Sequence, residues 1–325
     1  MKLHSLMDSI AAEQRIRAYV RETPLKHSRR FSESTRANVF LKLENLQETG
    51  SFKLRGAANR LLALPSQQAA RGIVAASNGN HALAVAAIGQ KLRVPVEVFV
   101  SEHVHPLRRS RIESLQARVQ AVSGGALVAE QTARREAEQS GRTYVSPYND
   151  MDVVAGQGTI AVEILRQLPQ LATRRLDAVF VAVGGGGLIG GIGLYLKSVS
   201  PDTEVVGCWP ENSPVLHECM RAGKIIEVQE EPTLSVSTAG GMEPGSVTLE
   251  IAQQVIVRSV FVTEAEILDA VRRIYQQDDQ LVEGAAGVAV AAFLKSASDY
   301  AGKTVVIVIC GGNADPALEA KIKEK

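Results

Sequence analysis

The sequence predicts an α/β protein in which parallel strands alternate with helices. Within residues 72–148, helical segments such as Ala129–Ser140 separate four short strands: Ile73–Ala76, Val96–Val100, Arg118–Val122 and Thr143–Pro147. A second set of strands follows further along the chain: Ala178–Val183, Glu204–Cys208, Val260–Val262 and Thr304–Ile309. The last of these reads T-V-V-I-V-I, a pattern typical of a strand that is buried on both faces of a sheet.

The composition is that of an ordinary globular enzyme. The 325 residues are 45% hydrophobic and 22% charged, which suits one or two domains of usual size. The net charge is +1 and no basic run occurs, so nothing indicates binding to nucleic acid. No segment approaches about 18 uninterrupted apolar residues, so we expect no membrane span.

The start of the chain and its cysteines indicate a cytoplasmic protein. The opening sequence M-K-L-H-S-L-M-D lacks the continuous apolar region of a secretory signal. The three cysteines, Cys208, Cys219 and Cys310, are odd in number and scattered along the chain. This usage favours a reducing compartment over a disulfide framework.

Four consecutive glycines, Gly184 to Gly187, lie between the strand Ala178–Val183 and a helix that continues from Leu188. A backbone without side chains can turn so that successive N–H groups point into one small volume. The helix N-terminus adds partial positive charge, so a phosphate group fits this place. The alternative is a turn that only allows close packing, but four glycines lose much more chain entropy than one turn requires.

A dinucleotide is the first phosphate ligand to consider. Gly185, Gly187 and Gly190 satisfy G-x-G-x-x-G, which on its own is a weak signal. A nicotinamide-binding fold also needs an acidic residue at the end of the next strand. Here that strand ends in Cys208 and Trp209. A nicotinamide-dependent oxidoreductase therefore remains an alternative.

Lys53 suggests a different phosphate ligand. It lies between Phe52 and Leu54 at the start of an expected helix, Lys53–Leu62. Most lysines with apolar neighbours are surface residues whose charge reaches the solvent. A lysine held in an apolar pocket, however, loses basicity and can form a Schiff base. A phosphate site together with a reactive amine indicates pyridoxal 5′-phosphate, which carries one phosphate and one aldehyde.

The segment Ser77–His81 follows the strand Ile73–Ala76 and precedes an apolar helix. The free N–H groups at a helix N-terminus suit the carboxylate of a substrate. The alternative is a simple helix cap, which needs only one polar residue and not a run of small and polar residues.

These motifs together resemble those of the fold-type II pyridoxal-phosphate enzymes. The sequences S-F-K-L-R-G, S-N-G-N-H, G-G-G-G-L and C-G-G-N are similar to those of the threonine/serine dehydratase and serine racemase branch, in the same order. Ala155–Thr159 and Leu281–Gly287 also resemble this branch. The resemblance implies a fold like that of the tryptophan synthase β-subunit, with two mostly parallel sheets flanked by helices. It further implies a large cofactor-binding domain of residues 1–71 and 149–325, into which a small substrate-binding domain of residues 72–148 is inserted.

The resemblance also implies roles for individual residues. Lys53 would hold the cofactor as a Schiff base and remove the α-proton of the substrate, while Phe52 would pack against the cofactor ring. Asn80 would bind the ring hydroxyl oxygen, and Cys310 would face the pyridine nitrogen. The substrate carboxylate would lie on Ser77, Asn78, Gly79 and His81. The phosphate would lie on Gly184, Gly185, Gly186, Gly187 and Leu188.

Cys310 bears on the choice of reaction. A thiol is a mostly neutral partner for the pyridine nitrogen at pH 7. A carboxylate would keep that nitrogen protonated and prolong the life of a carbanion, whereas a thiol favours expulsion of a β-leaving group. The alternative is a buried structural cysteine. Glu283 also allows two interpretations: it caps the helix Gly284–Phe293, or it lies near the cofactor as the resemblance implies.

The chain departs from the family pattern at three places. Racemases of this branch carry serine at the position of Asn78, and asparagine cannot exchange a proton near pH 7. Metal-activated relatives carry acidic residues at or near Trp209 and Val215, so we expect no metal site here. Val236-Ser237 replaces the usual Asp-Gly, which bears on substrate choice and on catalytic competence.

The sequence thus predicts a pyridoxal-phosphate-dependent ammonia-lyase that converts a β-hydroxy amino acid to a 2-oxo acid and ammonia. L-Threonine or L-serine is the default substrate, and the resemblance implies a homodimer. A bulkier substrate is an alternative: phenylserine, hydroxyaspartate or a product of hydroxyectoine catabolism. Three further functions stay open: an amino acid racemase, a nicotinamide oxidoreductase and a non-catalytic binder of a phosphate ligand.

Overall fold

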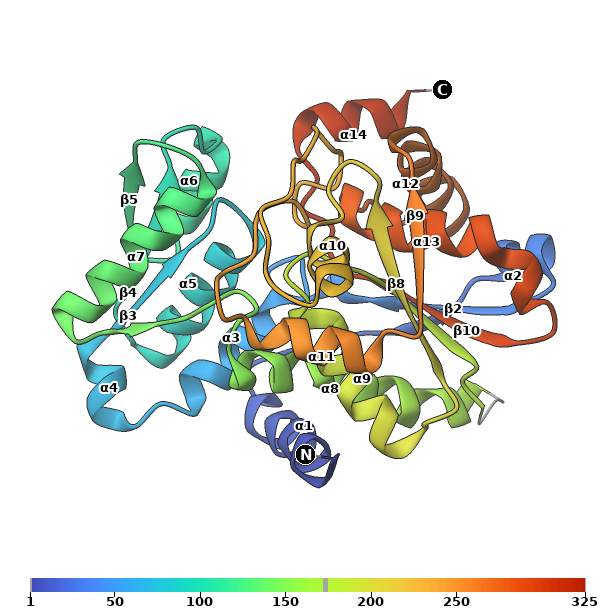
Figure 1. Cartoon of the computed structure of the whole chain (residues 1–325), viewed down its shortest axis with the longest axis horizontal. Helices are drawn as coiled ribbons and strands as arrows, with labels where there is room; N and C mark the ends of the chain where they lie inside the picture. Colours follow the sequence, from blue (N-terminus) through green and yellow to red (C-terminus); the bar gives the residue numbers. More distant parts are fainter. Residues whose placement is uncertain (1, 172–174, 325) are drawn as a thin grey trace.

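The computed structural model describes residues 2–171 and 175–324, which form two β-sheets side by side (Figure 1). The larger sheet has the order β1-β2-β10-β7-β8-β9. Its strands are β1 (Leu25–His27), β2 (Asn38–Leu43), β10 (Thr304–Ile309), β7 (Ala178–Ala182), β8 (Glu204–Pro210) and β9 (Arg258–Val262). All its neighbouring strands are parallel except β1, which runs antiparallel to β2.

The smaller sheet is entirely parallel and has the order β5-β4-β3-β6. Its strands are β3 (Ile73–Ala76), β4 (Val96–Ser101), β5 (Arg118–Val122) and β6 (Thr143–Tyr144). The helices around it are α4 (Ser66–Arg71), α5 (Asn80–Leu92), α6 (Pro106–Glu113) and α7 (Ala126–Ser140). Because β3 to β6 form a separate sheet and α5, α6 and α7 connect its strands, we propose that residues 72–148 form a domain inserted into the larger one.

Helices cover both sides of the larger sheet (Figure 1). On one side lie α12 (Glu264–Asp278), α13 (Gly284–Ser296) and α14 (Pro316–Lys323). On the other side lie α1 (Lys2–Ile16), α3 (Lys53–Leu62), α8 (Met151–Gln167), α9 (Gly187–Val199) and α11 (Val247–Val255). The remaining helices are α2 (Arg29–Thr35), α10 (Val215–Ala222) and three 3₁₀ turns, η1 (Glu44–Leu46), η2 (Leu168–Leu171) and η3 (Ala297–Tyr300). No helix among residues 2–171 and 175–324 is long and apolar enough to cross a membrane.

The predicted strands are confirmed with one correction. Thr304–Ile309 is a strand over its whole predicted length, and every one of its residues is buried. The strand predicted at Thr143–Pro147 is wrong beyond Tyr144. The Val145 N–H still donates to the Val74 carbonyl of β3 at 2.9 Å, but the Val145 carbonyl meets His81 and the Pro147 carbonyl meets Lys53. Proline also has no N–H with which to continue a ladder of hydrogen bonds.

A network of buried charges fixes α3 in the larger domain. Arg55 donates hydrogen bonds to both Glu44 and Glu163, at distances from 2.7 to 2.9 Å. Lys42 on β2 reaches Glu163 on α8 at 2.6 Å. The side chains of all four residues are fully buried. Burial opposes ionisation of Glu163, but Arg55 and Lys42 outweigh it and lower the pKa of this carboxyl to about 2. The network therefore joins α3, η1, β2 and α8.

Candidate active site

Lys53 is the first residue of α3 and points into a cavity between the two sheets. Its Nζ donates a hydrogen bond to the Pro147 carbonyl at 2.9 Å and lies 5.1 Å from the centre of the Phe52 ring. Burial lowers the pKa of Lys53 to about 8, against a partial opposing effect of Cys310 and Glu283. A much larger fraction of the amine than in an ordinary lysine is therefore neutral, and so nucleophilic, near physiological pH.

The glycine loop lies on one side of Lys53. Gly186 has φ of 83° and immediately precedes α9, so this position favours glycine. A side chain at Gly184 would meet the Thr238 backbone at 2.9 Å, and one at Gly185 would collide with the Tyr148 ring. Close approach of the backbone is therefore required here. The first N–H groups of α9 have no acceptor within the helix and are available to an anion.

One cavity joins the glycine loop to the other residues that the sequence predicts for the cofactor. Phe52, Lys53, Asn80 and Cys310 line it together with Gly184, Gly185, Gly186, Gly187 and Leu188. Tyr148, Ser237, Thr238 and Glu283 complete most of its wall. Residues more than 250 positions apart in the sequence therefore face one small volume, as the motifs predict.

A second cavity, of about 650 Å³, opens on the other side of Lys53. This volume lies within the usual range for small-molecule sites. Ser77, Asn78, Gly79, Asn80 and His81 all line it. Gly79 precedes α5 and its position offers no side chain to cap that helix, so the simple-cap interpretation is wrong. The N-terminus of α5 is left open toward this cavity.

Asn78 and His81 are among the side chains of this segment that hold the loop. Asn78 Oδ1 accepts a hydrogen bond from the Ser101 N–H at 2.8 Å. His81 Nε2 lies 2.8 Å from the Val145 carbonyl oxygen. Burial, together with the nearby Lys53, lowers the pKa of His81 to about 3, so the ring is neutral and its Nε2–H donates to that carbonyl. A substrate carboxylate would therefore meet the main-chain N–H of His81 rather than a charged ring.

Asn80 is held by a chain of hydrogen bonds. Its Nδ2 donates to both carboxylate oxygens of Glu283, at 2.9 and 3.0 Å, and its Oδ1 accepts from Asn313 at 2.7 Å. Asn313 Nδ2 also donates to the Thr49 carbonyl at 2.9 Å. Glu283 precedes α13 without capping it, so of its two interpretations the position near the cavity is confirmed. The Asn80 amide is thus fixed in a single orientation, with Nδ2 against Glu283, and both residues line the cavity.

Cys310 follows β10 and is buried beside the cavity. Its carbonyl oxygen accepts a hydrogen bond from the Phe52 N–H at 3.1 Å, which joins the end of β10 to the residue before Lys53. Burial, reinforced by the nearby Glu283 carboxylate, raises the pKa of the Cys310 thiol well above its ordinary value. The thiol is therefore neutral, as the sequence predicts.

The departures from the family pattern have distinct environments. Trp209 and Val215 are buried in the apolar core. Among the residues that the structure describes, no three His, Cys, Asp or Glu side chains cluster in a way that could hold a metal ion. Ser237 lines both cavities beside Lys53, and its Oγ lies 3.4 Å from Asn80 Nδ2. Val236-Ser237 therefore changes the wall of the site.

The glycine loop is supported from behind by residues that no sequence motif indicates. The Tyr148 ring fills the space over Gly185, and its hydroxyl accepts a hydrogen bond from the Glu243 N–H at 2.9 Å. The Glu243 carboxylate in turn accepts from Ser146, Asn149 and Arg134. No local pattern could have identified this cluster, because Glu243 lies 94 to 109 positions from its partners.

Comparisons with known proteins agree with this geometry. The family described as pyridoxal-phosphate dependent enzymes matches residues 16–311. The chain is 38% identical over 321 residues to the L-threonine ammonia-lyase of Thermotoga maritima, which covers 99% of this chain and 78% of that protein.

Two solved structures are also similar. Threonine deaminase isoform 2 of Solanum lycopersicum gives a TM-score of 0.92 at 27% identity, over 99% of this chain and 92% of that one. The serine racemase of Dictyostelium discoideum gives a TM-score of 0.87 at 30% identity, over 95% of this chain and 98% of that one. The chain therefore belongs to the family of pyridoxal-phosphate-dependent enzymes, and its cofactor is pyridoxal 5′-phosphate. The predicted family and fold class are confirmed.

The residues present fit this cofactor. The neutral fraction of the Lys53 amine suits the aldehyde, and the side-chain-free turn at Gly184 to Gly187 suits the phosphate. Asn80 Nδ2 suits a ring oxygen, and a neutral thiol at Cys310 suits an unprotonated ring nitrogen. These assignments of individual residues remain predictions.

The lowered pKa of Lys53 predicts how the apoenzyme captures its cofactor. Only the neutral amine attacks an aldehyde, so the rate of capture should rise with pH up to about 8 and level off above it. Mixing apoenzyme with pyridoxal phosphate from about pH 6.5 to about pH 10 and following visible absorbance measures this rate. A rate that keeps rising to about pH 10, as for an ordinary lysine, would contradict the prediction.

Proposed function

We propose that this enzyme removes water from a β-hydroxy amino acid, by default L-threonine or L-serine, to give a 2-oxo acid and ammonia. The observation that carries the proposal is the position of Lys53. Its amine lies on the boundary between the glycine-loop cavity and the cavity beneath the N-terminus of α5. One group thus faces both the expected cofactor and the expected substrate.

Pyridoxal phosphate supplies an electron sink for the carbanion that forms when a substrate loses its α-proton. The protein's residues do the rest. The first main-chain N–H groups of α5, those of Asn80 and His81, hold the substrate carboxylate and so orient its α-proton toward Lys53 Nζ. The N–H groups of Ser77 and Gly79 already donate to the Phe99 carbonyl and to Ser77 Oγ. The lowered pKa of Lys53 leaves part of this amine free to accept the proton. The neutral Cys310 thiol does not donate strongly to the ring nitrogen, which favours loss of the β-hydroxyl over a long-lived carbanion.

The relatives support this choice of reaction. The Thermotoga maritima protein is named for threonine ammonia-lyase activity, and the Solanum lycopersicum protein is a threonine deaminase. Purified holoenzyme should release 2-oxobutanoate from L-threonine and pyruvate from L-serine, each with one equivalent of ammonia. Product release coupled to a 2-oxo acid dehydrogenase measures this. Absence of turnover on L-threonine, L-serine and hydroxyaspartate, with cofactor bound, would support a non-catalytic protein.

Asn78 predicts that racemisation is slow. Racemisation needs a proton delivered to the face of the substrate opposite Lys53, and an amide does not ionise near pH 7. Asn78 is also held by its hydrogen bond to Ser101. Chiral chromatography of an L-serine reaction should therefore show pyruvate with little D-serine. D-Serine formed as fast as pyruvate would overturn the choice of a lyase over a racemase.

We also propose a cytoplasmic homodimer. The described cysteines Cys208, Cys219 and Cys310 are all free and buried, which suits a reducing compartment. Light scattering on purified protein tests the oligomeric state, and a mass near 34.8 kDa, that of one chain, would refute the dimer.

A further inference from the structure

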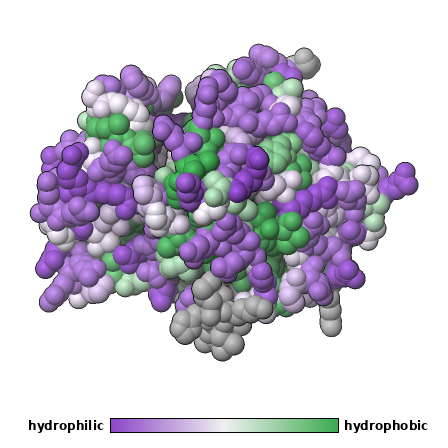
Figure 2. Space-filling view, in the orientation of Figure 1, coloured by the Kyte–Doolittle hydropathy of each residue, from purple (hydrophilic) through white to green (hydrophobic). Residues whose placement is uncertain are grey.

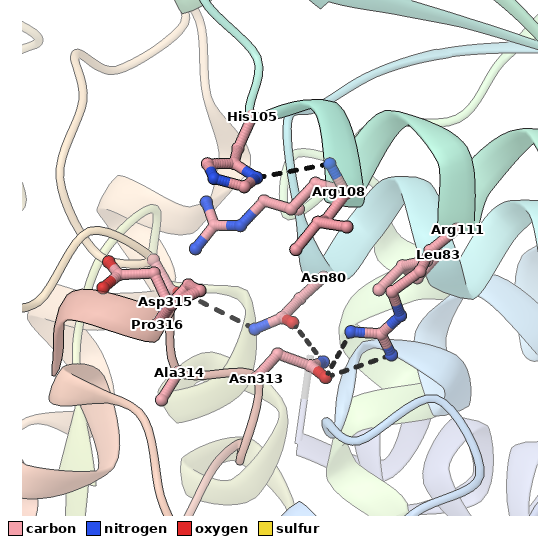
Figure 3. A pocket seen from close by; sticks show the side chains of 12 residues that line it. Asn80, Leu83, His105, Arg108, Arg111, Asn313, Ala314, Asp315 and Pro316 are labelled. Carbon is pink, nitrogen blue, oxygen red and sulfur yellow. Dashed lines mark hydrogen bonds between the residues drawn. The ribbon is translucent and has the colours of Figure 1, made fainter. Parts of the chain in front are cut away.

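Arg108 on α6 lines the substrate cavity. Its side chain lines the cavity that holds Lys53 and also two adjoining hollows against the larger domain. It is half-buried, yet its guanidinium makes no hydrogen bond or ion pair with any residue in the described part of the chain. Figure 3 shows the group extended between His105 and Asp315, above Asn80. A guanidinium in such a position is available to an anionic ligand.

The charges around Arg108 favour an anion. In the hollow of Figure 3, Arg111 adds a second guanidinium, which already donates to Asn313 Oδ1 at 3.3 and 3.4 Å. Among the described residues, Asp315 is the only carboxylate lining this hollow, and its Oδ1 accepts from the Leu318 N–H at 2.8 Å. Glu130, Glu230 and Glu231 line the larger cavity and Glu283 lines the other adjoining hollow, but none of these four carboxylates lines the hollow of Figure 3. The hollow therefore has an excess of positive charge.

The hollow adjoins the place expected for the substrate carboxylate. Gly79 and Asn80 at the N-terminus of α5 line both the hollow and the substrate cavity, and Arg108 lines both as well. One molecule can thus meet two separate anion-binding groups, the open helix N-terminus and the guanidinium.

We infer that Arg108 binds a second carboxylate, carried on the β-carbon of the substrate, and that the enzyme prefers a dicarboxylic β-hydroxy amino acid of the 3-hydroxyaspartate class. The inference rests on the proposed elimination reaction. The α-proton and the β-hydroxyl leave as water, and one water is taken up again when ammonia is released. 3-Hydroxyaspartate then yields oxaloacetate and ammonia, with atoms balanced and no oxidant required.

The test compares Arg108→Gln with Arg109→Gln. Arg109 is the next residue on α6, is exposed and pairs with Glu113 at 2.8 Å, so it is a matched control. In Arg108→Gln the ratio of kcat/KM for 3-hydroxyaspartate to that for L-serine should fall about 30-fold, the loss typical of one charge-assisted pair. In Arg109→Gln the ratio should stay as in the wild type. Because Arg108 makes no pair with the described part of the chain, the variant should fold.

A binding measurement separates this inference from the reaction. Calorimetric titration of the holoenzyme with succinate, a dicarboxylate that cannot be dehydrated, should show binding that Arg108→Gln weakens about 30-fold. Butyrate, with one carboxylate, should bind more weakly than succinate. Its affinity should be the same for the wild type and for Arg108→Gln. If succinate binds through Arg108 but no amino acid is turned over, the proposed function fails and the subsite stands. If threonine or serine is turned over while Arg108→Gln changes neither the ratio nor succinate binding, the inference is wrong.

Discussion

Replacing Lys53 with alanine should lower turnover by at least about 10⁴-fold, because the covalent anchor and the general base are lost together. The holoenzyme absorption that borohydride removes from the wild type should also be absent. Coupled detection of 2-oxo acid measures the activity, and absorption spectra measure the bound cofactor. The partial exposure of Lys53 to the cavity means that its loss leaves the apolar core intact.

Two further variants serve as controls for Lys53→Ala. Lys53→Arg keeps a positive charge but cannot form a Schiff base, so it should be as inactive as Lys53→Ala. Lys197→Ala removes an exposed lysine near the end of α9 and should behave as the wild type. Activity of Lys53→Ala within about tenfold of the wild type would discard the proposed mechanism.

Replacing Arg55 with methionine should reduce the free energy of unfolding by about 3–5 kcal/mol. The change leaves the buried carboxylates of Glu44 and Glu163 without their main cationic partner, although Lys42 still reaches Glu163. Urea denaturation followed by the fluorescence of Trp209 measures the loss. This residue is the only tryptophan in the chain and is buried in β8, so it reports on the larger sheet.

Arg60→Met is the matched control because Arg60 lies on the same helix, α3. It pairs with Asp150 and Asp152 nearer the surface, where an ion pair contributes about 1 kcal/mol or less. A similar small cost for Arg55→Met would show that Glu44 and Glu163 relax or take up protons on losing their partner.

The sequence predicts helices and strands most accurately where the local residue pattern and the tertiary environment favour the same structure. The helix Lys53–Leu62 has its predicted limits, and Thr304–Ile309 is an uninterrupted buried strand. Strand β2, by contrast, is not evident from the sequence, because Lys42 interrupts its apolar pattern. That lysine is fully buried, and Glu163, 121 positions away, compensates its charge. A pairing of this kind cannot be found from local periodicity.

The same limit applies to the candidate site. Its motifs are local, so the sequence identifies Lys53, the glycine loop and Ser77–His81 separately. The groups that orient them come from elsewhere in the chain. Glu283 and Asn313 fix Asn80 from 203 and 233 positions away. Only the fold could decide whether Glu283 caps a helix or faces the cavity.

The position of β10 in the larger sheet has a consequence for the order of events during synthesis. The strand is the last of the described strands, yet it lies between β2 and β7 and pairs in parallel with both. Until residues 304–309 have left the ribosome, β1 and β2 have no neighbour that joins them to β7, β8 and β9. The Phe52 N–H also lacks its acceptor, the Cys310 carbonyl, until then. The nascent chain therefore keeps an open sheet edge until almost its full length has been synthesised. At that stage chaperones would bind it and aggregation would compete with folding.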